Sequence, residues 1–99
     1  MKNGLASVTR DDFDLFQECF RSAGFDVGDS RYDEQSFGSW FIELTKQGLP
    51  KQRVVWDGKD GWLIVAAFQS DRWLDRWVGE KKSDQTIEAA ISQLETPFN

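Results

Sequence analysis

The sequence predicts an α+β domain in two layers: an N-terminal helix, an antiparallel meander of three or four strands, and a C-terminal helix. Three observations predict this class. Amphipathic segments with a helical period open and close the chain. Between them, apolar runs of strand length alternate with short turns that contain glycine. Such short links join antiparallel neighbours, whereas parallel strands need long crossover connections.

The composition is that of one small domain, residues 1–99, with a single hydrophobic core. Five Trp and eight Phe provide large rings to fill that core. No segment approaches the ~20 apolar residues that a membrane span needs. The first residues lack the apolar stretch of a signal peptide, and the single cysteine forms no internal disulfide. We therefore expect a cytoplasmic protein without a membrane partner.

The first helix is predicted over about residues 10–23, with Thr9 as its N-cap. Gly24 supplies a left-handed end to the helix, and Phe25 follows where a Schellman motif places its apolar contact. The N-cap, the apolar face and the terminal glycine therefore all predict the same helix. The apolar stripe consists of aromatic residues three and four positions apart: Phe13, Phe16 and Phe20.

Polar residues 26–38 indicate a loop with room for a short edge strand at 31–37. Residues 39–46 alternate and predict a strand with one buried side. Residues 51–56 and 62–68 predict a hairpin around a loop with two glycines. The run 62–68 is apolar on both sides, which predicts a central strand covered on both faces. Its second apolar side is the alternative place for a partner or a second copy of the chain.

Two elements complete the predicted order. Residues 70–78 fit both a fourth strand and the face of a helix, and their tryptophan content favours the strand. The last helix is predicted over about residues 87–95, with Asp84 or Thr86 as its N-cap. Its apolar positions are Ile87, Ala90, Ile91 and Leu94.

The tryptophans are the largest side chains available to both core and surface. About three of the five are expected in the core, because large rings must fill much of a small fold. The others are candidate binding anchors. Trp56 and Trp62 flank the loop 57–61 and are expected to pair across their two strands.

The residue inventory predicts no enzyme, no cofactor and no metal site. Histidine, the commonest general base and metal ligand, is absent. Cys19 lies on the apolar stripe and is interpreted as a small buried hydrophobe. The acidic residues of segment 26–34 lack the EF-hand pattern for calcium. Asp57 and Asp60 are interpreted as turn formers rather than as an acid–base pair.

The first candidate for partner binding is a basic–aromatic repeat, in which Arg72-Trp73 recurs as Arg76-Trp77. On a strand, the two tryptophans are expected on one face and the arginines, with Leu74, on the other. Tryptophan and arginine dominate interface hot spots, which favours a protein partner. The same residue types also stack on bases and hold phosphates, although interleaved aspartates weaken a phosphate field.

The second candidate surface is the acidic segment 26–34, with Asp29, Asp33 and Glu34 as binding residues. Residues 1–36 hold eight acidic and four basic residues, a net −4 of the total −5. Such a surface is suited to a basic partner.

Taken together, the sequence predicts a small acidic protein–protein interaction module of inhibitor, immunity or accessory type. Small acidic bacterial proteins that neutralise a toxin or nuclease are the analogy, on charge and size alone. The alternative is a nucleic-acid-associated protein that uses residues 72–77 with Lys81 and Lys82, although an acidic chain argues against it. Homodimerisation through the third strand or an edge strand is compatible with either function.

Overall fold

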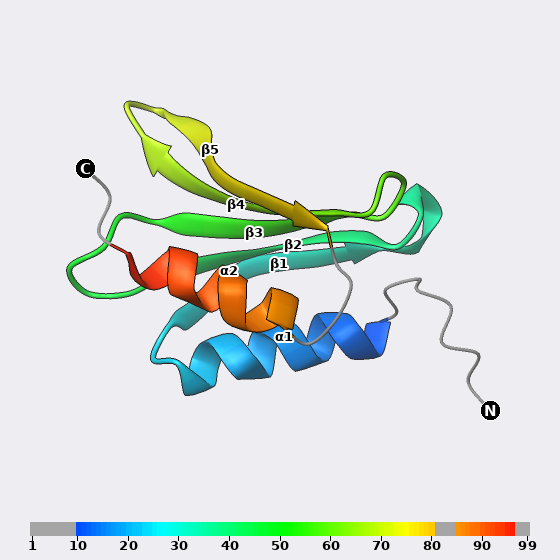
Figure 1. Ribbon diagram of the computed structural model, residues 1–99, viewed down its shortest axis with the longest axis horizontal. Helices are drawn as coiled ribbons and strands as arrows, with labels where there is room; N and C mark the ends of the chain where they lie inside the picture. Colours follow the sequence, from blue (N-terminus) through cyan, green and yellow to red (C-terminus); the bar gives the residue numbers. More distant parts are fainter. Residues whose placement is uncertain (1–9, 81–84, 97–99) are drawn as a thin grey trace.

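The computed structural model describes residues 10–80 and 85–96. Five strands form one antiparallel sheet in the order β1-β2-β3-β4-β5, and both helices lie on the same side of it (Figure 1). The predicted α+β arrangement is confirmed, with five strands instead of three or four. The elements are α1 (Arg10–Ser22), β1 (Asp26–Asp33), the 3-10 turn η1 (Glu34–Ser36), β2 (Ser39–Thr45), β3 (Gln52–Asp57), β4 (Trp62–Gln69), β5 (Arg72–Glu80) and α2 (Gln85–Glu95).

Strand β1 occupies most of the segment that was predicted to be a loop. It is an edge strand and pairs only with β2, with an irregularity between Val27 and Ser30. Only Val27 and Tyr32 of this strand pack against the core. An edge strand is present, but at 26–33 instead of the predicted 31–37, and residues 26–30 were wrongly predicted as loop. An edge strand with one open side needs few apolar residues, so it leaves no clear period in the sequence.

Strand β5 confirms the strand interpretation of residues 70–78. Ser70 and Asp71 connect it to β4, and both have positive φ angles, 56° and 66°. Two consecutive residues with positive φ are typical of the tight turns that close hairpins. β4 is an interior strand, paired with both β3 and β5, as predicted for residues 62–68. The predicted cover on both faces was wrong, because both helices lie on one side of the sheet and the second apolar side of β4 lies on the other.

Helix α1 ends as predicted. The amide of Phe25 donates to the carbonyl of Phe20 at 3.1 Å, and the amide of Gly24 donates to the carbonyl of Arg21 at 2.9 Å. With Gly24 at a φ of 95°, these bonds make a Schellman motif. The predicted caps Thr9 and Asp84 lie outside the described residues. Thr86, the other predicted cap, lies inside α2.

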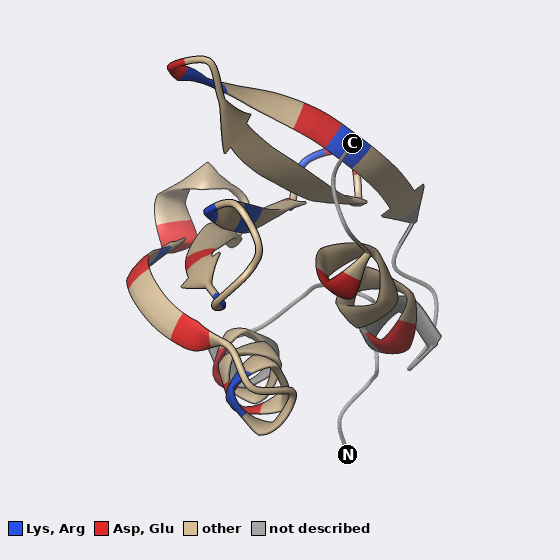
Figure 2. Cartoon of the chain, turned by 90° about the vertical axis from the view of Figure 1, so that its left-hand side faces the viewer, with Lys and Arg blue, Asp and Glu red and all other residues tan. Residues whose placement is uncertain are grey.

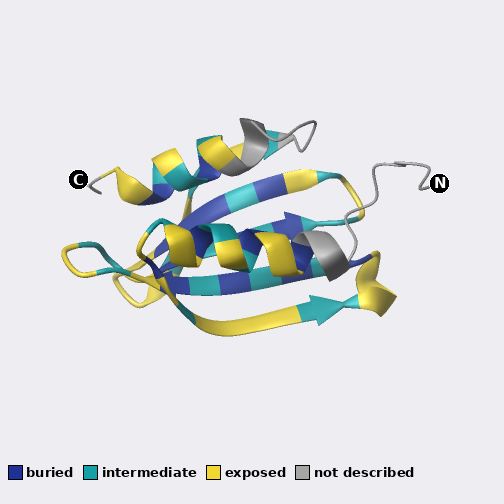
Figure 3. Ribbon diagram, turned by 90° about the horizontal axis from the view of Figure 1, so that it is seen from below, coloured by how far each residue is buried: buried dark blue, intermediate teal, exposed yellow. Residues whose placement is uncertain are grey.

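The core lies between the sheet and the two helices, where buried strand residues face the apolar stripes of α1 and α2 (Figure 3). Trp40 pairs with Trp56 across β2 and β3, and both are buried. The predicted pair of Trp56 and Trp62 was wrong, because Trp62 is opposite Asp57 on the other face. Trp77 packs against the core, so three of the five tryptophans face it although only two are fully buried.

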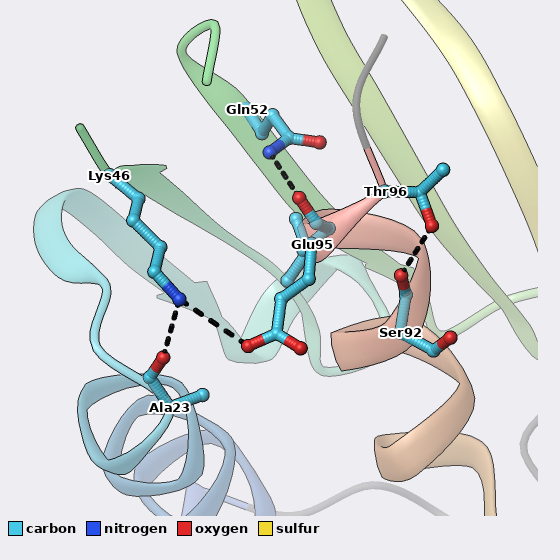
Figure 4. Close-up of polar contacts among 7 residues, drawn as sticks. Ala23, Lys46, Gln52, Ser92, Glu95 and Thr96 are labelled. Carbon is cyan, nitrogen blue, oxygen red and sulfur yellow. Dashed lines mark hydrogen bonds and ion pairs between the residues drawn. The ribbon is translucent and has the colours of Figure 1, made fainter. Parts of the chain in front are cut away.

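The C-terminus of α1 is bound by a cation from the sheet side of the molecule. Lys46 Nζ donates to the carbonyl of Ala23 at 2.9 Å and lies 3.4 Å from Glu95 Oε2 of α2 (Figure 4). The last carbonyls of a helix have no partner within it, and the helix dipole favours positive charge there. Lys46 therefore links the ends of both helices.

The C-terminus of α2 is bound in the same way from β3 and β5. The buried side chain of Gln52 donates through Nε2 to the carbonyl of Leu94 at 2.9 Å. Its Oε1 accepts a 2.7 Å hydrogen bond from Arg76, which also donates to the carbonyl of Thr96 at 3.0 Å. We call Gln52 and Arg76 the α2 clamp. Arg76, a predicted partner-binding residue, thus contributes to the fold itself.

Candidate functional site

The side of the sheet opposite the helices carries an apolar row that crosses four strands. Its residues alternate with core residues along each strand, and the strand register places them side by side. No described helix lies over them (Figures 1 and 3). We call this side the outer face. The apolar row consists of Phe41, Val55, Ile64 and Val78.

Three large apolar side chains of the outer face are exposed to solvent. The exposed fractions are 38% for Trp62, 39% for Phe68 and 49% for Val78. Trp62 and Phe68 lie at opposite ends of β4, with Ile64 of the row between them. An antiparallel sheet that faces water on one side normally carries polar residues there. The outer face departs from that pattern.

Arg53 stacks on aromatic rings of the outer face. Its Cζ atom is 4.1 Å from the centroid of the Trp73 ring and 5.8 Å from that of Phe41. Ala66 lies between Arg53 and β5 in the register and is only 3% exposed, because the arginine reaches over it to Trp73. The Nε of Arg53 is buried without a hydrogen-bond partner. Stacking therefore holds this guanidinium in place but provides no hydrogen-bond acceptor for its Nε.

A concavity of about 450 Å³ lies on the outer face beside Arg53. We call it the arginine concavity. Phe41 and Val55 provide its apolar wall, and it includes the backbone region around Trp40. Its polar lining comes from β1, η1, β2 and β3: Arg31, Asp33, Ser36, Ser39 and Arg53.

The acidic groups near the arginine concavity already have partners within the chain. Asp33 accepts hydrogen bonds from Ser36 Oγ at 2.9 Å and from the amide of Gln35 at 3.0 Å. The Ser36 hydroxyl is the main cause that lowers the pKa of Asp33, and Arg31 adds to it. Glu43, directly opposite Arg53, pairs instead with Lys51 at 3.1 Å.

The two arginines of the concavity have no such partners. Neither Arg31 nor Arg53 forms a salt bridge with any residue that the structure describes. A guanidinium carries five N–H donors. The concavity therefore holds two cations whose hydrogen-bonding capacity is largely unused.

Phe37 is the most exposed large apolar residue of the described chain, at 68%. Its φ of 61° lies in the left-handed region, which is rare for a bulky side chain and often marks functional positions. A Cβ at Gly58 would lie 2.0 Å from the Phe37 carbonyl oxygen, so the β1–β2 connection packs closely on the β3–β4 hairpin. This packing fixes the backbone of Phe37, which follows the concavity residue Ser36 in the chain.

Sequence reasoning missed Phe37 and the arginine concavity. The signal for Phe37 was an aromatic residue within a polar connection that ends in Gly38. The concavity had no local signal, because Arg31 and Arg53 are brought together only by the strand register.

The predicted basic–aromatic surface does not form as one face. β5 has an irregularity opposite Val65 and Ala66, where Arg76 is the additional residue. Trp73 therefore lies on the outer face and Trp77 on the core side. The expectation that both tryptophans share one face was wrong for this reason. Exposed Arg72 lies beside the β4–β5 turn, while Lys81 and Lys82 fall outside the described residues.

The predicted acidic surface follows the β1 edge of the sheet. Asp29 is exposed in the irregular part of β1, and Glu34 is exposed in η1. Asp33 is the N-cap of η1 and is therefore committed to local structure. Acidic residues also lie on both helices, away from the outer face (Figure 2).

The described part of the chain contains no cluster of three or more Cys, Asp or Glu residues able to hold a metal ion. Asp57 accepts hydrogen bonds from the amides of Lys59 and Asp60, which confirms its interpretation as a turn former. Cys19 is half-buried rather than buried, because it borders the open groove between α1 and α2. Neither described helix is long and apolar enough to cross a membrane.

Comparisons with known proteins give no relative. No protein-family model matches the chain, and no curated protein or solved structure is similar to it.

Proposed function

We propose that this protein is a protein–protein interaction module without enzymatic activity, which occupies the surface of a partner with its outer face. The apolar row, which crosses four strands without a described helix over it and ends at the exposed Val78, is the observation that carries the proposal. Contiguous exposed apolar surface marks interaction sites in folded proteins. An inhibitor, immunity-type or accessory role fits a module that acts by binding alone. The single free cysteine favours the cytoplasm as its compartment.

The anchors of this surface are expected among its aromatic residues. Trp62 is exposed, and Trp73 is stacked by Arg53. Aromatic residues and arginine supply a large share of the binding energy in interfaces. Their burial against a partner would remove the solvent exposure that the isolated chain shows.

Net charge contributes to how such a partner is approached. The chain carries −5 overall, with Asp29 and Glu34 exposed on the β1 edge and further acids on the helices. A negative field steers a basic partner toward the molecule and raises the association rate. The acidic segment would thus raise the rate of association, and the outer face would form the contacts of the bound complex.

The test is a pull-down from lysate of the native host with tagged protein, with and without nuclease. We expect one stoichiometric protein that survives nuclease treatment. It should be lost with the double variant Trp62→Ser, Val78→Lys on the outer face. Leu15→Lys is the matched control, since Leu15 is 49% exposed on α1, on the helix side. Circular dichroism and thermal unfolding check that all variants fold.

Other outcomes of this experiment discriminate between functions. A partner that binds the outer-face variant unchanged, or that only Leu15→Lys releases, would contradict the proposal. Untagged copies of this chain would identify a homodimer. A partner that disappears with nuclease would favour the nucleic-acid alternative through Arg72 and Trp73, although the structure places Trp77 on the other face and uses Arg76 in the α2 clamp.

A further inference from the structure

We propose that the arginine concavity receives a carboxylate of the protein partner, from an Asp or Glu side chain that adjoins apolar residues lying on the apolar row. This inference rests on the proposed function and specifies the chemistry of the partner. It concerns the outer face of β1, β2 and β3, where cationic and apolar groups adjoin.

Unused donors are the first argument. Arg31 and Arg53 line the concavity and form no salt bridge with a described residue. Arg53 is only partly buried, and its guanidinium carries further N–H donors besides the buried Nε. A carboxylate matches the planar guanidinium best.

One of the two arginines, Arg53, is already held in place. Arg53 is fixed against Trp73 at 4.1 Å and against Phe41 at 5.8 Å. Less side-chain freedom is then lost when it binds. Ser39 Oγ accepts a hydrogen bond from the amide of Gly58 at 2.9 Å, which leaves the Ser39 hydroxyl proton as a further donor at the concavity.

The charge of the lining also favours a single carboxylate. Arg31 and Arg53 contribute two positive charges, and Asp33 contributes one negative charge. Both oxygens of Asp33 already accept hydrogen bonds, from Gln35 and Ser36. The net charge of the lining is therefore +1. A single carboxylate neutralises it, whereas a phosphate dianion would leave an excess of negative charge.

The apolar wall of the concavity indicates that apolar residues flank the partner's carboxylate. Phe41 and Val55 belong both to the concavity and to the apolar row. A carboxylate on a solvated acidic tail would leave them exposed. An acidic residue next to aromatic or aliphatic residues would cover them while its carboxylate binds the arginines.

The test uses a random peptide library displayed on phage and selected on the full chain, so the natural partner need not be known. Selected peptides are synthesised, and their affinities are measured by titration calorimetry. We expect an Asp or Glu beside an apolar residue in the selected sequences. Changing that acid to its amide, or Arg53→Gln or Arg31→Gln in the protein, should weaken binding by about tenfold or more.

Arg21→Gln is the matched control, because Arg21 is an exposed arginine on α1, on the helix side and outside the concavity. It should leave affinity unchanged within about twofold. Arg53→Lys, which keeps the charge but loses the planar fork, should bind with intermediate affinity.

Three results would overturn the inference: selected peptides without an acidic residue, no enrichment over the Arg31→Gln, Arg53→Gln double variant, or displacement of the peptide by single-stranded DNA. Peptides that need Trp62 and Val78 but tolerate loss of both arginines would refute the carboxylate site and leave the proposed function intact. A host partner that still binds after loss of both arginines would also refute the carboxylate site and leave the proposed function intact.

Discussion

The two faces of the sheet are built from the same five strands and differ in what covers them. On the core side, residues such as Leu63 and Val65 are fully buried under the helices. On the outer face, their neighbours Ile64 and Val78 remain partly or half exposed. Apolar composition is similar on both sides of β4, so composition alone does not reveal which side is covered. An apolar face without a described cover is where a partner is best sought.

The two faces also treat polar groups differently. On the core side, Lys46, Gln52 and Arg76 each donate to carbonyls at the ends of the helices or to one another. The indole N–H groups of the buried Trp40 and Trp56 are exceptions, since both lack a hydrogen-bond partner. On the outer face, Arg31 and Arg53 have no described salt bridge. Lys46, Gln52 and Arg76 thus stabilise the fold on the core side, whereas Arg31 and Arg53 remain available on the outer face.

The difference in burial between the two faces is tested most directly by truncating two adjacent side chains of β4, Leu63 and Ile64. Leu63→Ala should lower the free energy of unfolding by about 2 to 5 kcal/mol, because it opens a cavity in a fully buried site. Ile64→Ala should cost about 1 kcal/mol, since the side chain is partly exposed in the folded chain. Urea unfolding followed by tryptophan fluorescence measures both. Equal losses would show that the outer face is as closed as the core.

The polar groups allow a second comparison, between two arginines of β5. Arg76→Gln should destabilise the chain by about 1 to 3 kcal/mol, because Gln52 Oε1 and the Thr96 carbonyl lose their donor. Arg72→Gln should change stability by less than about 0.5 kcal/mol, as is usual for exposed positions. Burial lowers the pKa of Arg76, but arginine stays charged at neutral pH. Thermal unfolding that ranks the two variants in the opposite order would contradict the α2 clamp.

The smallest expected effect concerns pH at the rim of the outer face. Hydrogen bonds from Ser36 and Gln35, with the charge of Arg31, hold the pKa of Asp33 below its ordinary 3.8. A lowered pKa stabilises the folded state above the ordinary value, and this contribution is lost as the pH falls through the lowered one. An NMR titration should give a midpoint below 3.8, and Ser36→Ala should raise it. A midpoint that does not change in Ser36→Ala would refute the role of the hydroxyl.

Much of the fold could be predicted where sequence signals are local. α1 combines an aromatic stripe with Gly24 and Phe25 at its end, and the structure forms the predicted Schellman motif. β2, β3 and β4 follow their alternation and turn residues. Most of β1 was missed because its polar residues serve an edge strand, and apolar period is the main signal for strands.

The candidate site could be predicted only in part, because it depends on strand register. Trp73 was identified as a candidate anchor and lies on the outer face. Its expected neighbour Trp77 lies on the core side, since one additional residue in β5 reverses the alternation. Arg31 and Arg53 are 22 positions apart in the chain, and only the pairing of β1, β2 and β3 brings them to one concavity.

Both edge strands of the sheet carry an irregularity, in β1 between Val27 and Ser30 and in β5 opposite Val65 and Ala66. Interrupted edges are poor templates for a further strand, and natural proteins use them to prevent sheets from joining end to end and aggregating. The chain can therefore keep an apolar surface in water with edge strands that are poor templates for assembling copies into fibres. Recognition is thereby directed to the broad side of the sheet and away from its margins.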